Sequence, residues 1–173
     1  MLKDKQFEAF GRITLAFNHI ESVIQGYTAI LLTPEELSIG WAVAEDGTFQ
    51  NKASRLKRIL DAICREYPTL EAFAAPILAK LIEAKKLAET RNGYVHALID
   101  HDFGKNETWL RVRNKRVACD EKAMFLLSGQ MSTLVWQLGN DVDKLFVQLQ
   151  RARTLPRQVT FKPNVAKDPS PST

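Results

Sequence analysis

Apolar residues recur every three or four positions along most of the chain, and this spacing predicts amphipathic helices. The clearest stripe predicts a first helix over residues 7–31, with Phe10, Ile13, Phe17, Ile20, Ile24, Tyr27 and Leu31 on one face. Another predicts a last long helix from a cap at Asp120 to about Ala152, with Leu127, Met131, Leu134, Leu138, Val142, Leu145 and Leu149 on one face. Such stripes have to pack against other helices, so the pattern indicates a helical bundle.

Shorter elements are expected between these two helices. Three helices are predicted: one over residues 33–44 with Thr33 as its cap, one over 49–66, and one from a start between 69 and 76 to about 99. A turn-rich loop follows, and residues 108–112 and 116–119 around Asn114-Lys115 predict a short β-hairpin.

The predicted fold class is therefore all-α. We expect a four- to five-helix bundle over residues 1–152, with a small β-hairpin before the last long helix. Residues 153–173 are rich in Pro, Ser and Lys and are expected to form a flexible tail rather than part of a core.

Composition narrows the class of protein. The 173 residues are 45% apolar and 25% charged, as in one ordinary soluble domain. No apolar run reaches the roughly 20 residues of a bilayer span, and the N-terminus lacks a secretory leader, so we expect a cytoplasmic protein without membrane contact. Cys64 and Cys119 stand singly, and neither metal-ligand clusters nor a Gly-rich phosphate loop are present, so no metal and no cofactor are expected.

Charge is distributed unevenly along the chain. Up to Gly104 there are 12 basic and 14 acidic residues, whereas the remainder has 12 basic and 6 acidic residues. Such asymmetry is typical of proteins that bind polyanions, and a solvated basic face explains it about as well.

Polar residues interrupt the apolar stripe of the helix that precedes the hairpin. Continuing that stripe beyond Ala88 leads to Asn92 and His96, with Arg91 beside them, so the buried face is expected to turn polar here. Gly93 costs about 1 kcal/mol relative to Ala inside a helix, which suggests that a backbone or a ligand comes close. These residue types point to a functional site.

The sequence Arg91-Asn92-x-x-x-His96, late in a long helix, resembles the signature of the HEPN superfamily, in which an Arg and a polar residue precede a His. The resemblance implies a homodimeric helical bundle whose motifs meet across the interface as a composite, metal-independent endoribonuclease site for RNA. Many members are toxins or phage-defence effectors, so an antitoxin or a nucleotidyltransferase is an implied partner. Some members are not catalytic, and the alternative is a dimeric nucleotide- or protein-binding module.

The chemistry of these side chains fits RNA cleavage without a metal. An imidazole can take the proton of a ribose 2′-hydroxyl as that oxygen attacks the adjacent phosphorus, and a guanidinium can stabilise the phosphorane. His96, Arg91 and Asn92 are therefore the candidate catalytic residues. Other interpretations stay open, because His96 can also cap a helix, Arg91 can pair with Glu89, and Asn92 can bond a carbonyl.

A second Arg-to-His spacing occurs early in the first helix. Arg12 and His19 are separated by six residues, but an apolar Ile13 follows this Arg, so we favour Arg91 and His96 as the site.

Two further sets of residues are candidates for supporting roles. Glu21 lies at the edge of the first helix's apolar stripe, and Arg91 or His96 are its expected partners. Lys52 is expected on the outer face of the helix over 49–66. Residues expected to bind RNA are Lys105, Trp109, Arg111, Arg113, Lys115 and Arg116. Basic residues that protect an edge hairpin from aggregation would produce the same pattern.

Overall fold

The computed structural model describes residues 4–102, 107–112 and 115–154 of the chain. In these ranges the elements are α1 (Asp4–Leu32), α2 (Leu37–Glu45), α3 (Phe49–Glu66), a 3-10 turn (Pro68–Leu70), α4 (Glu71–Val95), β1 (Leu98–Asp102), β2 (Glu107–Val112), β3 (Lys115–Ala118) and α5 (Glu121–Thr154). The expected tail beyond Thr154 lies outside the described residues. The fold class predicted from the sequence, a helical bundle with a small β element before the last long helix, is confirmed.

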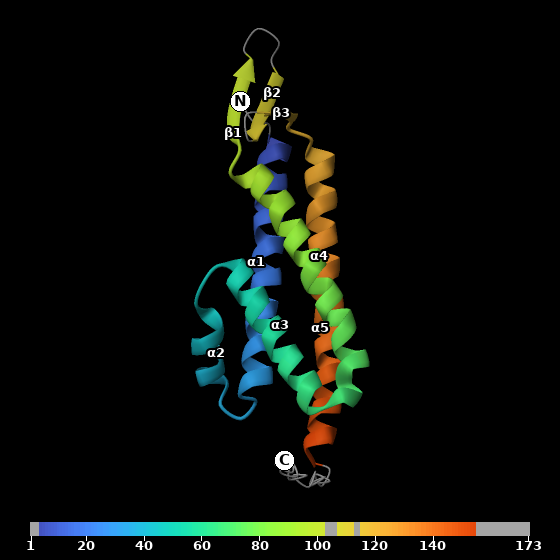
Figure 1. Ribbon diagram of the computed structural model, residues 1–173. Helices are drawn as coiled ribbons and strands as arrows, with labels where there is room; N and C mark the ends of the chain where they lie inside the picture. The colour runs from blue at the N-terminus through green and yellow to red at the C-terminus, as the bar shows by residue number, and fades with distance from the viewer. Residues whose placement is uncertain (1–3, 103–106, 113–114, 155–173) are drawn as a thin grey trace, which may run out of the picture.

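The helices form an elongated bundle with the sheet at one end (Figure 1). α1 and α5 run side by side along its length, α3 and α4 cover them, and α2 lies outside α1 at the end away from the sheet. Asp120 caps α5 as expected, because its Oδ1 accepts hydrogen bonds from the backbone N–H groups of Lys122 at 2.9 Å and Ala123 at 3.3 Å. No helix in the described ranges has the length and apolar character needed to cross a membrane.

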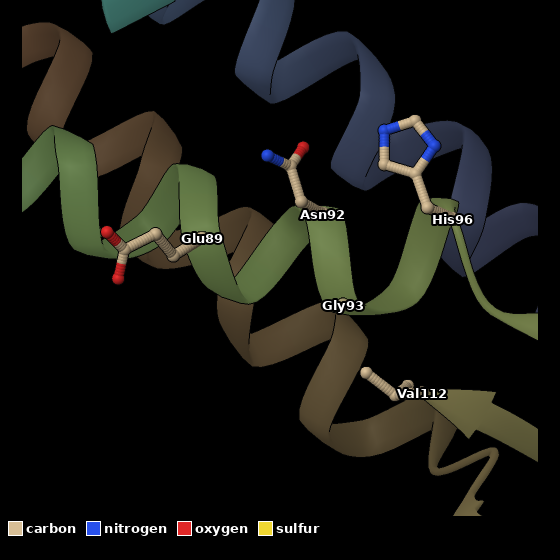
Figure 2. Close-up of a pocket in the computed structure, with 5 residues that line it drawn as sticks. All are labelled: Glu89, Asn92, Gly93, His96 and Val112. Carbon is tan, nitrogen blue, oxygen red and sulfur yellow. The ribbon is translucent and has the colours of Figure 1, made fainter. Parts of the chain in front are cut away.

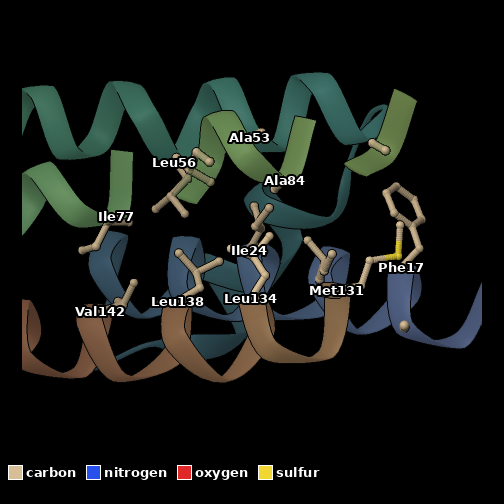
Figure 3. Close-up of a cluster of buried hydrophobic side chains, with 14 of the residues drawn as sticks. Phe17, Ile24, Ala53, Leu56, Ile77, Ala84, Met131, Leu134, Leu138 and Val142 are labelled. Atoms are coloured by element: carbon tan, nitrogen blue, oxygen red, sulfur yellow. The ribbon is translucent and has the colours of Figure 1, made fainter. Parts of the chain in front are cut away.

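The apolar stripes predicted for the long helices form the core. Ile13, Ile20 and Ile24 of α1 are fully buried. They belong to the same cluster as Leu56 of α3, Ile77 of α4, and Met131, Leu134 and Leu138 of α5. Figure 3 shows side chains from all four helices meeting in this cluster. Burial of this apolar surface stabilises the bundle and fixes the position of α4.

The sheet has three strands, so the predicted two-stranded hairpin is incomplete. α4 ends at Val95 rather than near Ile99, and Leu98–Asp102 pairs antiparallel with β2. An ion pair across the two strands favours this pairing, since Arg111 Nε donates to Asp100 Oδ2 at 2.9 Å. The order of strands is β1-β2-β3.

α2 packs on α1 through its smallest residues. Only Gly40 and Ala44 of this helix are buried. A Cβ at Gly40 would lie 2.7 Å from the backbone oxygen of Ala29, so the close approach of the two helices requires glycine here. The larger apolar side chains of α2 are exposed, namely Leu37, Ile39, Trp41 and Val43.

The start of α2 also differs from the prediction. Glu36 occupies the cap position instead of Thr33, and the hydroxyl of Thr33 donates to the carbonyl oxygen of Glu36 at 3.0 Å. The predicted capping residue therefore stabilises the turn before the helix.

Candidate functional site

The three motif residues lie at the C-terminal end of α4, beside the sheet. Arg91 and Asn92 are in the last two turns, and His96 is the residue that caps the helix. The backbone N–H of His96 donates to the carbonyl oxygen of Asn92 at 3.1 Å. The chain then turns into β1, so the end of α4 and the edge of the sheet form one surface.

A pocket of about 550 Å³ opens at this place. It is lined by Glu89, Asn92, Gly93, His96 and Val112. Figure 2 shows the side chains of Asn92 and His96 projecting from the same side of α4, as their spacing of four residues predicts. An amide and an imidazole are therefore available together to a ligand.

The expectation that the buried face of α4 turns polar is wrong. The buried stripe of α4 ends at Ala88, and both Asn92 and His96 are exposed. The last two turns of the helix extend to the surface, so these polar side chains keep their contact with water. The polar residues thus mark the place where the helix emerges from the core.

Arg91 lies beside the pocket rather than in its lining. Its guanidinium carbon is 4.8 Å from the centroid of the Phe17 ring of α1. Its Nη1 donates to Asn92 Oδ1 at 3.0 Å. None of the salt bridges between described residues joins Arg91 to Glu89, so that alternative for Arg91 is not observed.

One donor of the Arg91 guanidinium is unsatisfied. Its Nε is buried and has no acceptor among the described residues. An unsatisfied buried donor costs about 1–3 kcal/mol, and stacking on an aromatic ring returns only about 0.5–2 kcal/mol. Stacking on Phe17 and the hydrogen bond to Asn92 offset part of this cost, and an acceptor that reached Nε from the pocket would remove it.

Glu21 pairs with Lys52 rather than with Arg91 or His96, the partners expected from the sequence. Its carboxylate accepts a hydrogen bond from Lys52 Nζ at 2.7 Å. The two side chains are 26% and 11% exposed, so Lys52 is buried against α1 and does not lie on the outer face of α3. Lys52 precedes Leu56 by four residues and therefore shares the core face of its helix, a signal that the sequence contained.

Those residues of the predicted RNA-binding set that the structure describes lie on two faces of the sheet. Directly opposite residues of antiparallel strands project to the same face, and Val112 pairs in register with Lys115. Lys115 therefore shares the face of the sheet that borders the pocket. Arg111 pairs with Arg116 on the opposite face, which also carries the half-buried Trp109. Lys105 and Arg113 lie outside the described residues.

Arg111 is also partly neutralised by its ion pair with Asp100. Lys115 is therefore the described residue of the predicted set that is best placed to meet a ligand at the pocket.

The two cysteines and the possible metal ligands are the other reactive groups of the described chain. Cys64 and Cys119 are free thiols, and burial raises the pKa of each above its ordinary value. Within the described ranges, no three His, Cys, Asp or Glu side chains are grouped so that they could hold a metal ion.

Comparisons with protein-family models, with curated proteins and with solved structures found no significant match to this chain.

Proposed function

We propose that this protein is a metal-independent endoribonuclease of the HEPN type that acts as a homodimer. The observation that carries the proposal is the pocket at the end of α4, where Asn92 and His96 project together and Arg91 is tethered to Asn92. The imidazole can act as a general base and the guanidinium can stabilise the charge of the phosphorane, which are two roles that phosphodiester cleavage by an internal nucleophile uses.

The reaction uses the ribose 2′-oxygen as the nucleophile. The imidazole of His96 accepts the 2′-hydroxyl proton as the oxygen bonds to the adjacent phosphorus. The bond from phosphorus to the 5′-oxygen breaks, and that oxygen takes up a proton from an acid. The products carry a 2′,3′-cyclic phosphate and a 5′-hydroxyl, and no water is consumed.

Arg91 acts on the charge of the phosphorane. Its guanidinium leaves Phe17 and donates in fork geometry to the phosphate oxygens, which also gives the buried Nε an acceptor. Asn92, which already accepts a hydrogen bond from Arg91, guides the guanidinium toward the pocket.

A homodimer supplies the second proton-transfer group. One motif contributes one imidazole, and the reaction needs a base and an acid at the same phosphate. Because Asn92 and His96 are exposed, a second copy related by a two-fold axis can bring its own motif to the same substrate.

Cleavage of RNA in the presence of EDTA tests the proposal. We expect wild-type protein to cut, and Arg91→Ala and His96→Ala to lose roughly 10²-fold or more of the rate, as expected for loss of an electrostatic or general-base group.

The chain offers matched controls in α1. Arg12 also stacks on an aromatic ring, with its guanidinium carbon 5.5 Å from the centroid of Phe125, and His19 is exposed. We expect Arg12→Ala and His19→Ala to cleave at the wild-type rate. Equal rates for His96→Ala and His19→Ala would refute the assignment of the site. RNA binding without cleavage by the wild type would favour the non-catalytic binding module instead.

A further inference from the structure

A second cavity lies between the end of α4 and the sheet. Its volume is about 200 Å³, and it is lined by Thr90, Gly93, Tyr94, Leu110, Val112 and Val117. Gly93 and Val112 also line the pocket that contains Asn92 and His96. The two cavities are therefore neighbours, and Figure 2 shows Val112 of β2 beside Gly93 of α4.

The walls of the two cavities differ in chemistry. Leu110, Val112 and Val117 provide an aliphatic wall from the sheet, and the ring of Tyr94 provides a second wall from α4. Two hydroxyls give this apolar cavity its side-chain polar groups. The hydroxyl of Thr90 donates to the carbonyl oxygen of Lys86 at 3.1 Å, which leaves its oxygen as an acceptor. Burial raises the pKa of the Tyr94 phenol, which stays protonated as a donor near neutral pH.

Gly93 is not required by the packing of the protein. A Cβ at this position would meet only Val112 Cγ1, at the ordinary contact distance of 3.9 Å. Glycine in a helix costs about 1 kcal/mol relative to alanine, and here no close helix or backbone accounts for that cost. Because Gly93 lines both cavities, a Cβ here would occupy space where the two cavities adjoin.

We propose that the apolar cavity binds the base of a nucleotide whose phosphate lies at Asn92 and His96. Apolar walls with a few polar groups suit a flat base, which presents its faces to the ring of Tyr94 and the valines and its edge to the hydroxyl of Thr90. The polar pocket suits the phosphate, because the amide and the imidazole can both donate to its oxygens. Gly93 lies where the sugar joins the two groups.

This inference rests on the proposed function in one respect, which is the place of the phosphate. It assigns to the cleavage site a subsite for the base on the 5′ side of the scissile bond. The corresponding fragment of RNA is a nucleoside 3′-monophosphate.

Titration calorimetry with the full-length protein tests the subsite. The probes are the four nucleoside 3′-monophosphates, with inorganic phosphate as the fragment that lacks a base. We expect at least one nucleotide to bind roughly 10-fold or more tightly than phosphate, in line with the usual contribution of one base. Nucleotides that all bind no better than phosphate would overturn the inference.

The decisive variant is Gly93→Ala, with Gly129→Ala as its control. Nothing lies within 4 Å of a Cβ at Gly129, so both changes fill open space on a helix and should leave the protein folded. We expect Gly93→Ala to lose about 10-fold in nucleotide affinity and to keep its phosphate affinity. Unchanged nucleotide affinity in Gly93→Ala would overturn the inference.

Failure of the inference and failure of the proposed function give different results. If wild type and Gly93→Ala cleave RNA equally fast and with the same base preference, the subsite is wrong and the nuclease stands. If no variant cleaves RNA but nucleotide binding depends on Gly93, the subsite stands and the catalytic function is wrong.

Discussion

The contact between α1 and α2 gives a sharp test of how this fold is held together. A Cβ at Gly40 would lie 2.7 Å from the carbonyl oxygen and 2.9 Å from the Cα of Ala29. Both neighbours are backbone atoms of α1, which cannot rotate away, so Gly40→Ala has to push the two helices apart.

The expected loss of stability follows from two opposing terms. Overpacking of a close contact costs about 1–3 kcal/mol, while alanine gains about 1 kcal/mol over glycine in a helix. The net loss is therefore up to about 2 kcal/mol. Because α2 buries only Gly40 and Ala44, detachment of α2 alone limits the loss.

Thermal unfolding measures the loss of stability, and hydrogen exchange measures the detachment of α2. We expect Gly40→Ala to lower the Tm by a few degrees, at roughly 2–4 °C per kcal/mol for a chain of this size. Amides of residues 37–45 should exchange faster while those of α5 stay protected. The control Gly129→Ala should raise the Tm slightly, because its Cβ meets nothing within 4 Å. A Gly40→Ala protein as stable as Gly129→Ala would refute the close approach of α1 and α2.

Three further predictions concern polar pairs that join different helices. Lys52→Met leaves the carboxylate of Glu21 without its partner and should lower the free energy of unfolding by about 1–3 kcal/mol in urea titrations. Asp141→Asn should destabilise the protein near neutral pH, because the hydrogen bond from Lys80 lowers the pKa of Asp141. A lowered folded pKa stabilises above the ordinary carboxyl range, so the difference from wild type should disappear as the pH falls through the folded pKa. Burial, with Asp143 nearby, raises the pKa of Tyr27 to about 12. Tyr27→Phe should therefore remove the latest step in an alkaline absorbance titration. The stability that Tyr27 contributes to the wild type should be lost as the pH rises toward about 12.

An exposed ion pair provides the control for Lys52→Met. Lys57 bonds Asp61 at 2.7 Å with side chains 57% and 41% exposed, so Lys57→Met should change the free energy of unfolding by less than about 0.5 kcal/mol. Equal losses for Lys52→Met and Lys57→Met would contradict the burial of Lys52.

The elements that the sequence predicts correctly depend on local information. The stripes of α1 and α5 recur within single helices, and the Asp120 cap needs only the three residues that follow it. β1 was missed because a strand is stabilised by its pairing partner, and Asp100-His101-Asp102 has the composition of a turn.

The same difference between local information and contacts between elements explains which features of the site could be predicted. The common face of Asn92 and His96 follows from helical spacing, and the pocket lies where that spacing predicts polar groups to gather. The resting contact of Arg91 with Phe17 and the pairing of Glu21 with Lys52 both join separate helices. Packing between helices determines such contacts, and the spacing of residues within one helix does not reveal them.

The chemistry of the RNA ends tests the central claim most directly. Wild-type protein in EDTA is incubated with RNA, and the termini of the fragments are identified by mass spectrometry, with His96→Ala and His19→Ala in parallel. We expect 2′,3′-cyclic phosphate and 5′-hydroxyl ends for wild type and His19→Ala, and intact RNA for His96→Ala. Fragments with 5′-phosphate ends, or the same fragments from His96→Ala, would contradict attack by the 2′-oxygen at this site.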